Sequence, residues 1–172
     1  MPETETAIDI LIKAIQRLRE NPFEARFSES TKGFIEMLGP EMPFAQKMAF
    51  ANQWLFRNTI MGIYERSASG NAMVHTTLVP TIVHTGVKDN VIPSVAKAVV
   101  NLRLLPGDES TVVIARLNEI VGDERVSIRP ISKPTEASGV TPMDSPSFKK
   151  VEASIKQSYP DVLSSPFLMI GA

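Results

Sequence analysis

Residues 95–104 read VAKAVVNLRL, and the alternation in this stretch decides the fold. In an extended strand every second side chain points to the same face, so this stretch predicts one buried and one exposed face. The face that we expect in the core is formed by Ala96, Ala98, Val100, Leu102 and Leu104. Arg103 therefore projects from the opposite face near the end of the strand, together with Lys97 and Asn101.

A second strand is predicted just upstream, over residues 78–83, which are apolar and rich in β-branched side chains. Pro80 favours an edge position or a bulge, because proline cannot donate a ladder hydrogen bond. A turn is expected at Pro93-Ser94, between the two strands. Further short strands are predicted at 125–131 and 166–170.

Helices are predicted before and after these strands in the sequence. The first begins at a cap formed by Thr6 and Asp9 and stops at Asn21-Pro22. Residues 67–71 read SASGN and predict a flexible connector. Further helices are predicted at about 30–38, 44–60, 110–121 and 146–158. In the second of these, the aromatic and aliphatic side chains that we expect in the core are Phe50, Trp54, Leu55 and Phe56.

Composition narrows the chemistry that the chain can carry. The 172 residues contain 18 Lys and Arg against 19 Asp and Glu, a net charge of −1, so we expect no nucleic-acid partner and no membrane contact. Cysteine is absent, which excludes thiolate catalysis and cysteine metal ligands. His75 and His84 are the only histidines, and both are expected at the surface without carboxylates at metal-binding spacing. We therefore expect no catalytic residue and no metal ligand in this chain.

The order of the elements predicts an α+β fold. Helix, helical insertion, strand, strand, helix and strand match a ferredoxin-like β-α-β-β-α-β domain if one strand precedes residue 1. Residues 132–144 are rich in Pro, Gly, Ser and Thr and read as a linker. The helix and strand of residues 145–172 then belong to a different layer or domain.

Two motifs resemble a known family. Residues 81–93 read TIVHTGVKDNVIP, and residues 98–107 read AVVNLRLLPG. Together they resemble the lid, or dimerisation, domain of the zinc-dependent metallopeptidases and aminoacylases of peptidase family M twenty. Within the helical region, residues 51–56 read ANQWLF and resemble the carboxypeptidase S, or Gly-Xaa carboxypeptidase, branch.

The resemblance implies a division of roles along the chain. Residues 1–131 would form the lid domain with a helical insertion at 22–70, residues 132–144 the linker, and residues 145–172 a returning piece of the catalytic domain. A first lid strand, whose His reaches the active site of the partner subunit, would precede Met1. The metal ligands and the general-base Glu would also lie outside this chain, which alone would bind no zinc and be inactive.

The resemblance also implies the activity of the parent protein. A homodimer joined through the lid would use two zinc ions to hydrolyse the amide of small peptides or N-acyl amino acids. Asn90 and, thirteen residues later, Arg103 match the residues that bind the free carboxylate of the substrate in the family. A guanidinium suits that role, because its rigid donor fork matches a carboxylate.

We expect the two strands to fold back antiparallel and bring Asn90 towards the Arg103 end. The alternative is a non-enzymatic ferredoxin-like module for dimerisation or ligand sensing, since such folds host many functions. A pure pairing module would have no reason to aim both residues at one groove.

Overall fold

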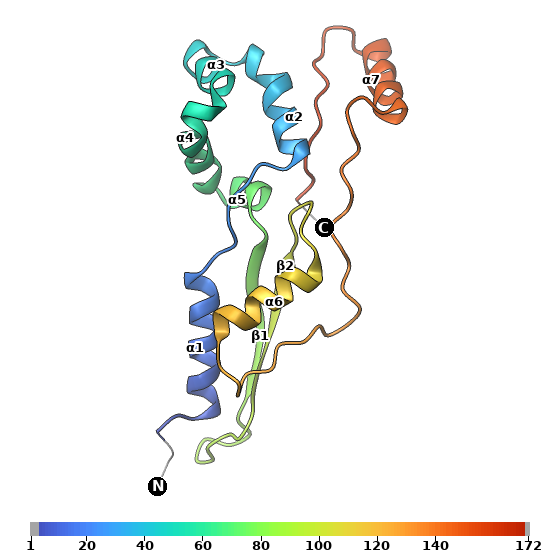
Figure 1. Cartoon of the computed structure of the whole chain (residues 1–172). Coiled ribbons are helices and arrows are strands. Elements are labelled where there is room, and N and C mark those ends of the chain that lie inside the picture. Colours follow the sequence, from blue (N-terminus) through green and yellow to red (C-terminus); the bar gives the residue numbers. More distant parts are fainter. Residues whose placement is uncertain (1–3, 171–172) are drawn as a thin grey trace. The chain divides into compact units, whose positions relative to one another are not determined.

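In the computed structural model, which describes residues 4–170, one antiparallel hairpin is the only sheet among the described residues (Figure 1). Its strands are β1 (Thr77–Thr85) and β2 (Ala96–Arg103), so the two central strand predictions are confirmed. The other elements are helices, and the chain is therefore α+β. They are α1 (Ala7–Glu20), α2 (Glu29–Leu38), the 3-10 turn η1 (Gly39–Glu41), α3 (Phe44–Ala51), α4 (Gln53–Glu65), α5 (Ala68–Val74), α6 (Ser110–Val121) and α7 (Pro146–Ser158).

The chain divides into two compact units, and each unit is built from several separate stretches of the sequence. Unit 1 takes the residues up to 24 and residues 76–104 and 108–137, which include α1, the hairpin and α6. Unit 2 takes residues 25–75, 105–107 and the chain from 138 on, which include α2 to α5 and α7.

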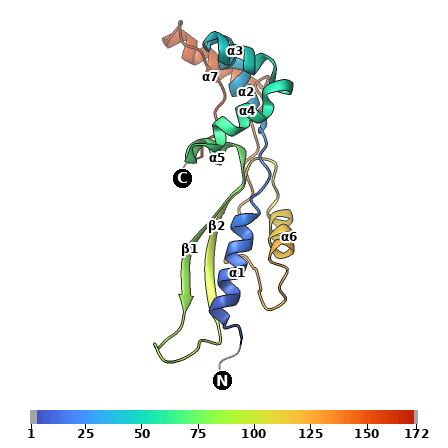
Figure 2. The same cartoon turned by 90° about the vertical axis from the view of Figure 1, so that its left-hand side faces the viewer.

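Unit 1 buries one face of the hairpin against helices. α1 lies along the hairpin and α6 packs beside α1 (Figure 2). The side chains of this core are Ala14, Leu18, Phe23, Val113, Leu117 and Val121, with Leu78, Leu102 and Leu104 of the hairpin region packed against them. Leu102 and Leu104 thus lie on the side that the alternation predicts. The helix α1 also begins as predicted, because Thr6 and Asp9 bond reciprocally as a capping box.

The strand pairing contains one irregularity. Pro80 pairs with Val100 and Ile82 with Val99, so Thr81 is an extra residue in β1. This is the bulge that Pro80 predicts, since its ring nitrogen has no hydrogen to donate. Residues 86–95 form the connection between the strands, which is longer than the tight turn expected at Pro93.

The helix α6 is capped from a distant part of the sequence. Sequence predicts that Ser110 or Thr111 caps it with its own side chain, and this is wrong. Instead the Glu136 carboxylate accepts a hydrogen bond from the Ser110 backbone N–H at 2.8 Å and another from the Ser110 hydroxyl. The hydrogen bonds from Ser110 lower the pKa of the Glu136 carboxyl. A negative charge at a helix N-terminus is also favoured by the helix dipole.

Two predicted strands do not form within the described residues. After the turn in which the Val126 N–H bonds to the Asp123 carbonyl, Pro130 leaves too short a run for a strand. Val126 and Ile128 nevertheless pack against the core of unit 1, so the predicted burial occurs without a ladder. Residues 166–170 pack Leu168 and Ile170 against the helical core of unit 2 rather than on a sheet edge.

The helical insertion differs from its prediction in two places. The helix expected over 44–60 breaks at Asn52 into α3 and α4, and residues 67–71 belong largely to α5. Ser67 caps α5 by accepting a hydrogen bond from the Gly70 N–H at 3.0 Å. Burial in α4 falls on Ile60 and Met61, whereas Trp54 is 82% and Leu55 60% exposed, so the predicted place of these two side chains in the core is wrong.

Truncating the centre of the unit 1 core should destabilise the chain strongly. Leu117 is 3% exposed, so Leu117→Ala leaves a cavity and should lower the free energy of unfolding by about 2–5 kcal/mol. Val112→Ala on the same helix, at a position 62% exposed, should change it by less than about 0.5 kcal/mol. Urea denaturation followed by circular dichroism measures both, and equal effects would contradict this description of the core.

Candidate functional site

One face of the hairpin carries no helix within unit 1, and we call it the open hairpin face. The register pairs its residues across the two strands as Thr77 with Arg103, Val79 with Asn101, Ile82 with Val99 and His84 with Lys97. Two of its side chains are cationic and none is acidic. Because positive charges on a surface raise the local concentration of anions, this face is suited to an anionic ligand.

Arg103 is positioned by its neighbours in the strand. Leu102 and Leu104 pack into the core of unit 1, which fixes the backbone on either side of position 103. The Arg103 side chain consequently leaves the strand on the open hairpin face, where it is exposed. Asn101 lies two residues away on the same face, at about 7 Å along the strand.

Asn90 lies at the other end of the hairpin. It is an exposed residue of the 86–95 connection, whereas Arg103 is the last residue of β2 and pairs with Thr77. The length of β2 alone separates the two ends by about 24 Å. The expectation that the fold-back brings Asn90 to the Arg103 end is therefore wrong. One small ligand cannot touch both residues of the same chain.

The two histidines differ from each other. His84 is exposed on the open hairpin face opposite Lys97, in agreement with its prediction. His75 is not a solvated residue, because its side chain is 12% exposed and its Nε2 lies 3.0 Å from the Glu65 carboxylate.

A metal site does not fit the residues present. Within residues 4–170, no group of three or more His, Asp and Glu side chains is arranged to hold an ion. The His75–Glu65 pair and the isolated His84 supply too few ligands for a zinc site, which needs three or four.

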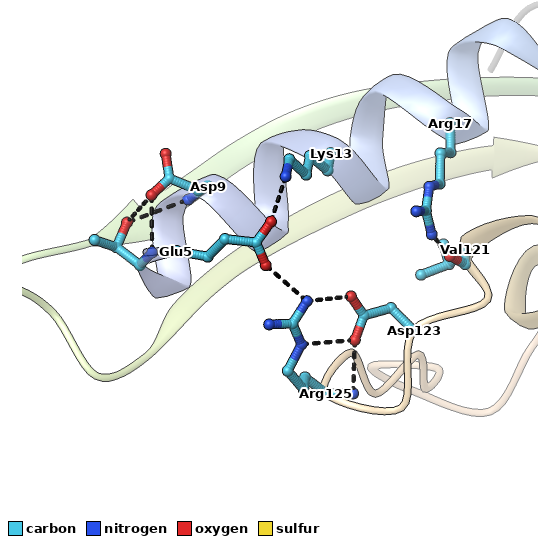
Figure 3. A network of polar contacts seen from close by, with 8 residues as sticks. Glu5, Asp9, Lys13, Arg17, Val121, Asp123 and Arg125 are labelled. Carbon is cyan, nitrogen blue, oxygen red and sulfur yellow. Dashed lines mark hydrogen bonds and ion pairs between the residues drawn. The ribbon is translucent and has the colours of Figure 1, made fainter. Parts of the chain in front are cut away.

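A network of charged side chains joins the start of α1 to the turn that follows α6 (Figure 3). Arg125 donates to both oxygens of Asp123 at 2.7 and 2.9 Å and lies 3.0 Å from Glu5, which also pairs with Lys13. The hydrogen bonds from Arg125 lower the pKa of Asp123 to about 2. Those from Lys13 and then Arg125 lower the pKa of Glu5. These groups neutralise one another, so the network is structural and does not form a ligand site.

Sequence reasoning missed this network. Arg125 reads as an edge charge of a predicted strand, and the spacing of Asp123 and Arg125 was the available signal for their pairing. Its contact with Glu5 joins residues far apart in the sequence, which no local pattern indicates.

Comparison with known families gives one match. The family described as the peptidase dimerisation domain matches residues 2–128, which is most of the chain. No solved structure matches.

Comparison with curated proteins gives relatives that are longer than this chain. "Probable carboxypeptidase S-like 2" of Dictyostelium discoideum is 35% identical over 170 residues, which cover 99% of this chain and 33% of that protein. Human "N-fatty-acyl-amino acid synthase/hydrolase PM20D1" is 34% identical over 174 residues, covering 99% of this chain and 34% of that protein. The bovine protein of the same name is 38% identical over 126 residues. The chain spans about a third of the length of the first two relatives.

Removing Arg125 should return the Asp123 carboxyl towards its ordinary acidity. In Arg125→Met the pKa of Asp123 should rise from about 2 towards 3.8, as measured by NMR titration of its carboxyl carbon. The control Arg129→Met changes an exposed arginine outside the network and should leave that pKa unchanged.

The same shift gives stability a direction with pH. Because the folded pKa lies below the unfolded value of 3.8, the pairing stabilises the fold above that pH and is lost as the pH falls through about 2. The stability difference between the wild type and Arg125→Met should therefore shrink across this window. A difference that grows on acidification would refute the assignment.

Proposed function

The chain belongs to the peptidase dimerisation domain family of peptidase family M twenty, and from this premise we propose that it joins two subunits of a hydrolase and binds the free carboxylate of the substrate. The substrate class is small peptides or N-acyl amino acids. Both kinds of compound carry a carboxylate close to the amide, and the names of the relatives refer to a carboxypeptidase and to a synthase/hydrolase of N-fatty-acyl amino acids.

The open hairpin face is the observation that carries this proposal. Arg103 and Lys97 leave the strand on a face without acidic side chains, and the core holds the backbone around Arg103 in place. A guanidinium on such a face can bind a carboxylate through two parallel hydrogen bonds. The hydrolytic step itself is assigned to residues outside the chain. Two zinc ions and a general base in the rest of the parent protein would supply it, and the chain alone would be inactive.

We assign Asn90 and Arg103 to the same substrate, but from different subunits. In one chain they lie at opposite ends of the hairpin, so a shared ligand needs Asn90 of one protomer beside Arg103 of the other. A two-fold dimer allows this, because each contact between residue i of one protomer and residue j of the other occurs twice by symmetry.

The domain organisation follows the same proposal. Residues 1–131 form the lid with its insertion at 22–70, residues 132–144 are the linker, and residues 145–172 return to the catalytic domain. The antiparallel hairpin with α1 and α6 on one side supports a ferredoxin-like lid whose remaining strands come from outside the chain.

Loss of the Arg103 guanidinium should weaken substrate binding in the parent enzyme. Arg103→Ala should raise KM for substrates with a free carboxylate by about 10- to 100-fold, with metal content unchanged. The KM of Arg103→Lys should lie between those of the wild type and Arg103→Ala, since an ammonium keeps the charge but cannot donate two parallel hydrogen bonds. Arg19→Ala, an exposed arginine of α1, is the control and should have no effect. Equal activity of the wild type on acid and amide forms of one substrate would exclude the carboxylate role.

Mixing two impaired variants tests whether the site is shared between subunits. Asn90→Ala and Arg103→Ala should each be impaired, and unfolding and reassembling them together should restore about a quarter of wild-type activity. Half of the dimers are then mixed, and each holds one intact site. If both residues act in the same subunit, no mixed dimer contains an intact site and activity stays at the level of the single variants.

A further inference from the structure

Helices α3 and α4 expose an unusual number of large apolar side chains. Phe44 is 77% and Trp54 82% exposed, and the exposed side chains of this kind on the two helices are Phe44, Met48, Trp54, Leu55 and Ile63. Ile63 follows Trp54 by nine residues and so lies on the opposite side of α4, and we call the other four residues the insertion surface. Single exposed apolar residues are ordinary, but a group of this size on two packed helices indicates an interaction site.

On α4 the insertion surface is the uncovered N-terminal end of the helix, because Trp54 lies two turns before the buried Met61 on the same side of α4. α4 buries Ile60 and Met61, and Met61 packs with Met73 and Val74 of α5 in the core of unit 2. α3 buries no residue, although it packs against α4. Side chains as exposed as Phe44 and Trp54 cannot line an enclosed pocket for one small ligand, because such pockets bury most of the ligand surface. They suit an extended apolar boundary instead.

The charged residues between Phe44 and Tyr64, on α3 and α4, are all cationic. Residues 44–64 contain the cations Lys47 and Arg57 and no acidic residue. Lys47 follows Phe44 by three positions and Arg57 follows Trp54 by three, which puts each cation beside an aromatic residue on the helix surface. Of the carboxylates that flank the segment, Glu41 precedes it and Glu65 is bound to His75. Residues 44–64 therefore combine aromatic groups with two cations and no carboxylate of their own, although Glu41 lies on η1, which packs against α3.

We propose that the insertion surface docks on an anionic lipid–water interface. Helices that lie in such an interface combine Trp, Phe and Leu, which enter the apolar boundary, with Lys and Arg, which stay at the headgroups. Indole and phenyl rings favour this depth. The proposal departs from the expectation of no membrane contact, which rests on the net charge of the whole chain and not on this segment. If the proposed function holds, an N-acyl amino acid with a long acyl chain would gather at the same interface.

The experiment uses Trp54, the single tryptophan of the chain, as its reporter. The full chain is titrated with vesicles of phosphatidylcholine and with vesicles of phosphatidylcholine and phosphatidylglycerol. With the anionic vesicles we expect a blue shift of the Trp54 emission and flotation of the protein, and with neutral vesicles much weaker binding. Lys47→Glu/Arg57→Glu should lower the affinity for anionic vesicles at least about tenfold.

The matched control carries the same change in net charge elsewhere. Lys149→Glu/Lys150→Glu reverses two exposed charges on α7 and should bind anionic vesicles nearly as well as the wild type. Phe44→Ser should weaken binding without any charge change, whereas Val87→Ser, at an exposed position of the hairpin connection, should not.

Four results would overturn the proposal. They are an unchanged Trp54 spectrum with no flotation, equal binding to neutral and anionic vesicles, equal losses in the two double variants, and a blue shift that depends on protein concentration without vesicles. The last would mean that a second copy of the chain covers the surface. None of these results bears on Arg103, so vesicle binding and carboxylate binding can fail separately.

Discussion

The register of the hairpin determines what each side chain of unit 1 can do. Because Thr77 pairs with Arg103 and Thr85 with Ala96, alternate residues of β2 meet either the helices or solvent. Leu102 contributes to the core, while its neighbours Asn101 and Arg103 are left on the open hairpin face. A slip of one residue would exchange these roles, so burial of the apolar face is also what positions the polar one.

The bulge in β1 determines which side chains of that strand lie on each face. Before Thr81 the open hairpin face takes Thr77 and Val79, and after it the face takes Ile82 and His84. The extra residue shifts the alternation by one, so a count from Thr77 alone would assign His84 to the wrong side. Pro80 explains why the extra residue occurs here, since its backbone nitrogen cannot join the ladder.

Sequence predicted the features that depend on near neighbours in the chain. The alternation over 95–104 predicted the faces of β2, and Thr6 with Asp9 predicted the start of α1. The approach of Asn90 to Arg103 was wrong because it depends on where the connection begins, which no pattern in the 86–95 segment specified. Trp54 was wrongly assigned to the core because α4 carries apolar residues around much of its circumference. Periodicity cannot say which of them the neighbouring helices cover. His75 and Glu65 came together through the path of α5, which sequence read as a connector.

The carboxylate of Glu136 at the start of α6 links two parts of the chain that are far apart in sequence. Ser110 has its backbone hydrogen bond only while the segment that follows Ile128 returns to it. Fraying of the first turn of α6 is therefore coupled to release of that segment, and the exchange of the Ser110 amide with solvent deuterium reports on both events at once. Proteolytic cleavage between Gly122 and Glu136 would convert this cap into a contact between separate peptides, with the loss of effective concentration that separation brings.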